Sequence, residues 1–304
     1  MTHEQETKDT SAAPSHPTDA QGKPAAPGGQ GKPRQHDKVT RMGTESIPRL
    51  ITEFAIPSIL GMLVNGAYNV IDSIFLGQAM GEIGLSTATV AMPIMTVFMA
   101  IAMLVGNGGN ALAALRMGEG KPEEAERSLG NTVTLSLIAS VVVAVVMFVP
   151  ACIDGLLSVS GATPEDWDYA MQFIRIISLG FIFQCIGMGV NNFIRTAGAP
   201  NRALGTMIIG AVACTAFNAL FVLVMGMGVV GSALATVCGQ AISCATVLWY
   251  FCLTKGVPMR LRLRMMPLHG ETVRLILSLG LASFAVQAGI AAVNFVLNNL
   301  LNMY

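Results

Sequence analysis

The sequence predicts an all-α polytopic membrane protein, with a six-helix N-terminal lobe followed by the first helix of a second lobe. Of its 304 residues, 53% are hydrophobic and only 12% are charged, and the mean hydropathy is +0.60. Soluble domains carry about twice that share of charged residues. Uncharged apolar stretches of about 20 residues are long enough to cross a bilayer as helices. About seven such stretches occur, at residues 50–76, 85–115, 129–149, 169–194, 203–225, 229–253 and 273–301.

These stretches divide the chain into four segments. Residues 1–45 are rich in Pro, Gly, Ser, Thr, Gln and Lys and have almost no apolar side chains, so we expect a disordered tail. Residues 46–254 form the six-helix lobe, and residues 255–271 form a linker. Residues 272–304 form the first helix of an incomplete second lobe. In the linker, arginines alternate with apolar residues over MRLRLRMM, a pattern that favours an extended segment.

The basic residues predict the orientation. All but Arg175 of the 18 Lys and Arg residues fall in the tail and in alternate loops, on one side of the membrane. By the positive-inside rule, that side is the cytoplasm, and the N-terminus lies there with it.

The seventh stretch resembles the first at an offset of 225 residues. The offset pairs Arg49, Leu50, Ile51, Ser58 and Asn69 with Arg274, Leu275, Ile276, Ser283 and Asn294. Because six helices separate the two copies, both would enter the membrane from the same side, as in transporters built from parallel repeats.

Asp72 is the candidate functional residue. It is the acidic residue deep in an apolar stretch, where a carboxylate costs about 2.5–3.5 kcal/mol even on a lenient insertion scale. Asn65, Asn69 and Asp72 follow one another at helical spacing, with Tyr68 beside them, so they form one polar face. Pro57, fifteen residues earlier, removes a backbone hydrogen bond and favours a bend. We interpret the face as a proton or cation site; the alternative is an aspartate held near the interface by water and hydrogen-bonded neighbours.

The other polar residues in the spans have helix–helix hydrogen bonding as their default role. This applies to Asn218 and Gln287, while Asn191 and Asn192 end their span just before a predicted tight turn. Four methionines, Met92, Met95, Met99 and Met103, share one face of the second span. Flexible thioethers suit a pocket for varied ligands, although such a face more often serves packing.

Nothing in the sequence indicates an enzyme. It has no HExxH or GxSxG motif and no paired intramembrane carboxylates, and its six cysteines show no CxxC spacing. Three of its four histidines lie in the tail. We therefore expect no catalytic residue, no metal site, no cofactor and no nucleic-acid partner.

Several segments, taken in order, resemble the multidrug and toxic compound extrusion (MATE) family of secondary transporters, and most of all its bacterial drug and toxin exporters. The resemblance covers nearly everything from Arg49 to the C-terminus. It rests on FAIPSILGMLVNGAYNVIDSIFLG, GNGGNALAALRMGEGKPEEAERSLGN, NNFIRTAGAP, GMGVVGSALAT and LGLASFAVQ.

The resemblance implies twelve helices in two lobes around a central cleft, in the cytoplasmic (inner) membrane of a bacterium. Such proteins export cationic or amphipathic compounds in exchange for protons or sodium. It assigns coupling to Asp72 and bending to Pro57. With it we expect a cation-coupling group of Asp72, Asn65, Asn69 and Asn218, and a substrate cavity that includes Tyr68, Met95, Met99, Asn191 and Gln287.

The chain departs from the family pattern in two ways. The family often places an asparagine and an aspartate where Cys214 and Asn218 stand. The loss of that second carboxylate favours protons over sodium. The second lobe also stops after its first helix, so we expect a truncated chain, a relic, or half of a split transporter whose other lobe is a separate chain.

One further alternative is a related flippase for a lipid-linked precursor. Such a protein needs several cationic residues along its cavity, and the spans offer only Arg175. In either case we expect membrane lipid and a small-molecule substrate as partners.

Overall fold

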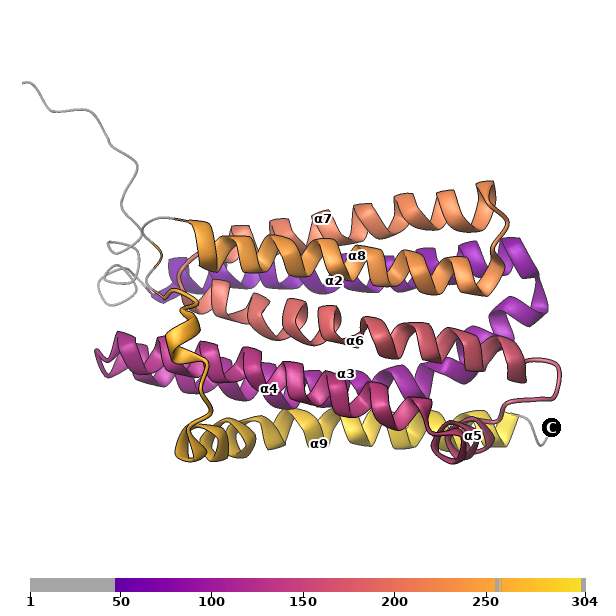
Figure 1. The fold of residues 1–304 in the computed structure, drawn as a ribbon. Helices are drawn as coiled ribbons and strands as arrows, with labels where there is room; N and C mark the ends of the chain where they lie inside the picture. The colour runs from indigo at the N-terminus through magenta and orange to yellow at the C-terminus, as the bar shows by residue number, and fades with distance from the viewer. Residues whose placement is uncertain (1–46, 255–256, 258, 302–304) are drawn as a thin grey trace, which may run out of the picture. The chain divides into compact units, whose positions relative to one another are not determined.

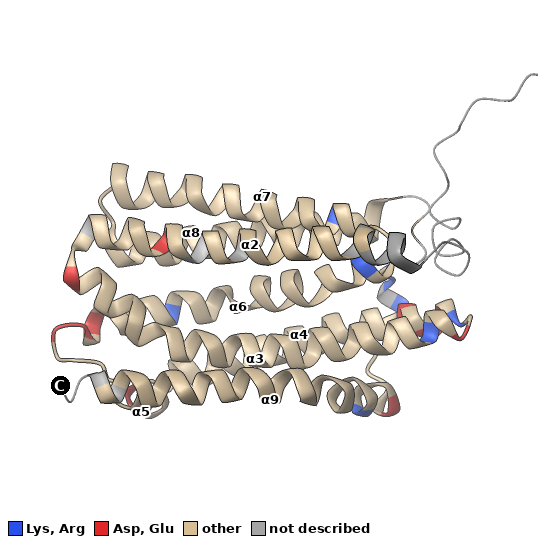
Figure 2. Ribbon diagram, turned by 180° about the vertical axis from the view of Figure 1, so that it is seen from behind, with Lys and Arg blue, Asp and Glu red and all other residues tan. Residues whose placement is uncertain are grey.

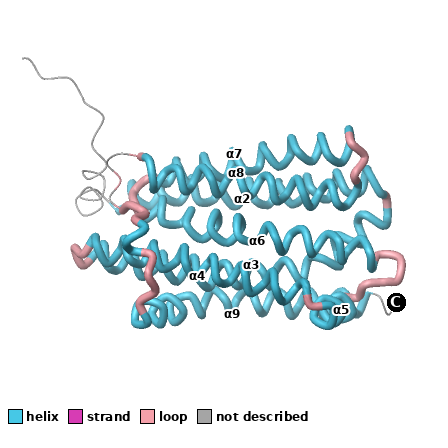
Figure 3. Tube along the Cα trace, viewed as in Figure 1, coloured by secondary structure: helices cyan, strands magenta, loops and turns pink. Residues whose placement is uncertain are grey.

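The computed structural model describes residues 47–254, residue 257 and residues 259–301 (Figure 1). The predicted disordered tail lies outside these residues. Within them the chain is helical and contains no strand, which confirms the all-α prediction (Figure 3).

Seven long helices match the seven predicted stretches. They are α2 (Ile47–Met80), α3 (Glu82–Gly118), α4 (Pro122–Phe148), α6 (Trp167–Thr196), α7 (Pro200–Asn218), α8 (Gly228–Leu253) and α9 (Gly270–Leu301). By length and composition, six of the described helices can cross a membrane, counting α7 together with the turn that extends it to Val224. In α2 the apolar stretch among the described residues is the shorter Ala55–Val64.

Two features of the helices were not predicted. A short helix, α5 (Pro150–Val159), follows α4 directly, because Pro150 has no N–H to continue α4 and suits the first position of a new helix. At the other end of the lobe, α7 passes into a π-helix, η1 (Ala219–Val224). The predicted tight turn between α6 and α7 is confirmed, and Gly198 takes a φ of 77° there that favours glycine.

Helix α3 is the centre of the packing, and its glycines make this possible. A Cβ at Gly106 would overlap the backbone of Gly189 on α6, and one at Gly109 would overlap Thr132 on α4. Gly108 lies against the carbonyl oxygen of Ile276 on α9. Glycine allows helix backbones to approach this closely in a membrane. The GNGGN segment therefore serves helix contact, and α3 runs through it without unwinding.

Two apolar clusters lie along the lobe. One joins α3, α4, α5 and α6 and includes a tilted ring pair, Phe98 and Phe181, with centroids 5.2 Å apart. The other lies where α6 ends and α7 begins, and includes Leu129, Phe193 and Phe251, all fully buried. Figure 1 shows α6 running between the α7–α8 pair and the α3–α4 pair, so both clusters use it.

The described Lys and Arg residues gather at one end of the helices, with one blue position farther along α6 (Figure 2). We call this the basic end; it carries the α3–α4 turn, the α6–α7 turn and the linker. We call the opposite end, where α5 and the α7–α8 turn lie, the acidic end. The orientation of these ends in a membrane stays a prediction.

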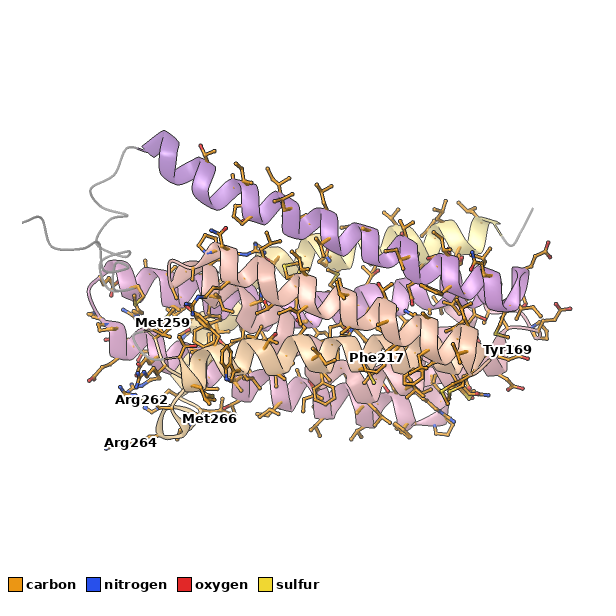
Figure 4. All side chains as sticks on the ribbon, turned by 90° about the horizontal axis from the view of Figure 1, so that it is seen from above. Tyr169, Phe217, Met259, Arg262, Arg264 and Met266 are labelled. Atoms are coloured by element: carbon orange, nitrogen blue, oxygen red, sulfur yellow. The ribbon has the colours of Figure 1, made fainter. Side chains whose placement is uncertain are left out.

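The linker before α9 is docked on α4 at the basic end. Its described residues are irregular except for a single 3-10 turn, Leu263–Met265. Glu126 of α4 is 7% exposed; its Oε1 accepts a hydrogen bond from the backbone N–H of Arg260 at 3.0 Å, and its Oε2 lies 3.2 Å from Nε of Arg262. Met259 is fully buried, and Figure 4 shows it with Arg262, Arg264 and Met266 at the end opposite Tyr169.

Changing Glu126 to Gln should loosen this linker. The substitution removes the charge that pairs with Arg262, and losing a partner of a largely buried charge costs roughly 1–3 kcal/mol. We expect trypsin to cut after Arg260 or Arg262 several-fold faster than in the unchanged protein, as measured by mass spectrometry of the fragments. Glu123, on the same helix but exposed, provides the matched control Glu123→Gln. Equal cleavage rates in the two variants would contradict a docking role for Glu126.

Candidate cation-coupling site

Three helices meet at the carboxylate of Asp72, eight residues before α2 ends. Oδ1 of Asp72 accepts a hydrogen bond from Nδ2 of Asn218 on α7 at 2.9 Å and another from Oγ of Ser232 on α8 at 2.9 Å. Asn218 is 1% exposed and Ser232 is fully buried. Hydrogen bonds to a charged group contribute about 1.5–3 kcal/mol each, so they offset much of the cost of placing this carboxylate in a membrane.

Asn218 lies where the helix geometry changes. It is the last residue of α7, and the π-helix η1 begins at the next residue. π-helical turns inside α-helices occur frequently at functional sites. The Nδ2 of Asn218 also lies 3.6 Å from Sγ of Cys214, one turn earlier.

The carbonyl oxygen of the Asn218 side chain has no hydrogen-bond partner among the described residues, although it is buried. Leaving a buried acceptor unpaired costs about 1–3 kcal/mol. The site thus offers an unpaired acceptor beside the carboxylate, where a proton donor or a small cation can be received. The described residues contain no group of three or more His, Cys, Asp or Glu side chains that could hold a metal ion.

The structure brings together two of the four residues predicted for coupling, Asp72 and Asn218. The side chains of Asn65, Asn69 and Tyr68 lie outside the described residues, so their place on the polar face stays a prediction. Pro57 is buried within α2, which continues through it as a helix, and its role as a bend is likewise a prediction.

Of the residues predicted to line a substrate cavity, Asn191 has contacts that favour packing. It is 5% exposed, and its Nδ2 donates to the carbonyl oxygen of Ala203 at 3.1 Å and to Oγ1 of Thr206 at 2.6 Å. These bonds fasten α6 to α7. Met95 packs against the Phe98 cluster. Met99 and Gln287 are half-buried, and their contact with a substrate stays a prediction.

An open groove lies beside the coupling site, between the end of α2 and the start of α3. Its volume is about 680 Å³ and it is lined mostly by apolar side chains, with Ser73, Gln78 and Glu82 as its polar members. Met92, from the predicted methionine face, lies at one side. An apolar wall with few polar groups is typical of small-molecule sites.

Sequence reasoning missed Ser232 and a hydrogen-bonded ladder across three helices. In the ladder, Nδ2 of Asn192 on α6 donates to Oδ1 of Asn107 on α3 at 2.9 Å, and Nδ2 of Asn107 donates to Oγ of Ser283 on α9 at 3.1 Å. Each partner is a common residue in an apolar helix, so only the spatial arrangement reveals the contact. The ladder shows that α9 is tied to the interior of the first lobe.

Comparison with known proteins decides the family. The sequence model of the MatE family matches residues 57–220, more than half of this chain. The chain belongs to the MatE family. A multidrug export protein, MepA of Staphylococcus haemolyticus, is 24% identical over 210 residues, which cover 68% of this chain and 45% of that protein.

Solved MATE structures have the same fold. The MATE multidrug transporter DinF-BH, solved in complex with a rhodamine dye, matches with a TM-score of 0.79 and 33% identity, over 85% of this chain and 57% of that one. An outward-facing MATE transporter matches with a TM-score of 0.71 and 25% identity, over 84% of this chain and 53% of that one. The chain thus spans about half the length of the MATE proteins it matches.

Proposed function

We propose that this chain forms the first lobe of a MATE exporter that expels cationic or amphipathic compounds in exchange for protons, with Asp72 as the coupling carboxylate. The observation that carries the proposal is the single carboxylate held by Asn218 and Ser232 at the meeting point of three helices. A carboxylate placed in a membrane interior is costly and marks proton or ion pathways.

The exchange follows from the charge of this carboxylate. When Asp72 takes up a proton, its attraction for the donors of Asn218 and Ser232 weakens, so the packing of α2 against α7 and α8 changes. One proton that crosses about 100 mV supplies about 2.3 kcal/mol, which is enough to bias an equilibrium between two conformations. Pro57 gives α2 a place to bend in response.

Protons fit this site better than sodium. The described neighbours of Asp72 supply one hydroxyl and one amide, and Cys214 offers a soft sulfur close to Asn218. Hard cations prefer oxygen ligands, so a sulfur neighbour and a single carboxylate favour the proton.

A cationic substrate fits the groove between α2 and α3. Its apolar wall can receive the hydrophobic part of a molecule, while Glu82 supplies the negative charge. The complex of the related DinF-BH with a rhodamine dye supports this substrate class. The flippase alternative requires a cationic cavity, and Glu82 gives this groove the opposite charge.

Proton release on substrate binding tests the proposal. A cationic rhodamine dye is added to the purified full chain in a weakly buffered solution that contains a pH indicator. We expect the unchanged protein to bind the dye and release protons, and Asp72→Asn to release at least tenfold fewer. Asp154→Asn, on the short helix α5, is the matched control and should behave like the unchanged protein. Equal release from Asp72→Asn and the unchanged protein would overturn the coupling role.

A further inference from the structure

A polar seam begins at the coupling site and follows the buried side of α8. Ser232, Thr236, Gln240 and Ser243 are spaced by four, four and three residues, so they share one face of the helix. Ser232 is fully buried and donates to Asp72, and Thr236 is 2% exposed. The face therefore leads from the carboxylate toward the basic end.

The seam ends in a polar cluster that joins α6, α7 and α8. Oγ of Ser243 lies 3.4 Å from the carbonyl oxygen of Thr206, and Oγ1 of Thr206 lies 2.6 Å from Nδ2 of Asn191. Asn191 is five residues before α6 ends at Thr196, at the basic end. The residue predicted for a substrate cavity thus lies at the inner end of this seam.

Gln184 of α6 faces the middle of the seam. A Cβ at Gly180 would overlap Val237, and one at Gly187 would contact Cys244, so α6 and α8 run in parallel with a fixed register. Gln184 lies between those glycines, at the height of Gln240. The side-chain carbonyl oxygens of Gln184 and Gln240 are both buried without a hydrogen-bond partner among the described residues.

Unpaired acceptors therefore occur at two levels of the seam, at Asn218 beside Asp72 and at Gln184 and Gln240 farther in. Each costs about 1–3 kcal/mol unless it is satisfied, and water is the usual partner of such groups in protein interiors. Successive polar residues on α8 are about one helical turn apart, roughly 5–6 Å, a gap that one bridging water spans.

We propose that this seam conducts protons between Asp72 and the basic end of the lobe, with Gln240 and Gln184 as positioning residues for the water between them. The inference rests on the proposed function of Asp72. On release, the proton leaves a carboxyl oxygen of Asp72 for a water. Each water that receives a proton passes one on, until a proton reaches the solvent at the basic end and Asp72 is left as a carboxylate.

The surroundings of Asp72 leave the seam as its polar connection toward the basic end. Of the titratable groups on the described elements packed against α2, Cys214 of α7 contacts Asn218. Glu82 of α3 and Cys238 of α8 form no hydrogen bond with the carboxylate, and η1 carries no titratable side chain. No charged side chain of these described elements forms an ion pair with Asp72.

The test follows the protonation of Asp72 from each side of a membrane. The full chain is placed in vesicles with its basic end facing the bath. A carbodiimide, which reacts with protonated carboxyl groups, then labels Asp72, and mass spectrometry measures the yield. When the bath pH alone is changed, the labelling of the unchanged protein should follow it. In Gln240→Met, an apolar change of similar volume, we expect that response to fall at least fivefold.

Two further variants separate the outcomes. Thr236→Val, close to isosteric, should also weaken the response to the bath, while Gln172→Met, at an exposed glutamine of α6, should leave it unchanged. If Gln240→Met and Thr236→Val respond like the unchanged protein, the seam is overturned and the coupling role of Asp72 stands. If Asp72 of the unchanged protein responds to pH on neither side, the coupling role fails and the seam fails with it.

Discussion

Replacing Gly280 with leucine is expected to detach α9 from the first lobe. A Cβ at Gly280 would overlap the carbonyl oxygen of Leu104 on α3, and Gly108 makes the reciprocal contact with Ile276. Both obstacles are backbone atoms, which cannot turn aside as a side chain can. Overpacking a well-packed contact costs about 1–3 kcal/mol and sometimes more, and here the nearby Asn107–Ser283 hydrogen bond would be lost as well.

Disulfide cross-linking measures this detachment. Cysteines placed at Asn107 and Ser283, whose side chains are hydrogen-bonded, should cross-link readily in an otherwise unchanged chain. Adding Gly280→Leu should lower the cross-linked fraction by at least half, together with the midpoint of thermal unfolding in detergent. Gly289→Leu is the matched control, since a Cβ there meets no atom within 4 Å. If Gly280→Leu cross-links as well as this control, α9 does not depend on the glycine contact.

The spans could be predicted because apolar length is a property of the sequence itself. Each of the seven stretches became a helix whose ends lie within a few residues of the prediction. The helix α5 was missed because Pro150 begins a new helix inside what reads as the end of a span. The π-helix η1 was missed because its residues, ALFVLV, carry no signal that separates π from α geometry.

The candidate site could be predicted only where a residue conflicts with its surroundings. Asp72 is conspicuous because a carboxylate is costly in an apolar helix. Ser232 is not conspicuous, since a serine can hydrogen-bond within its own helix, and only folding brings it to Asp72. Gln240 and Gln184 likewise lie far apart in sequence, so the register between α6 and α8 was needed to relate them.

The largest functional effect is expected from Asp72→Asn. Asparagine has nearly the same shape as aspartate, so α2 should still pack against Asn218 and Ser232. It cannot exchange a proton, so substrate export should no longer respond to the proton gradient. We expect gradient-driven export of a cationic dye to fall at least tenfold, while the amount of protein in the membrane stays the same.

The most direct measurement is dye efflux from the bacterium that makes this chain, so that any partner is present. Three strains are compared under an imposed pH gradient: unchanged, Asp72→Asn, and one lacking the gene. The proposed mechanism predicts that Asp72→Asn loses the rhodamine dye as slowly as the strain without the gene, and that the unchanged strain loses it at least tenfold faster. Efflux from Asp72→Asn at the unchanged rate would contradict the role of Asp72 in coupling.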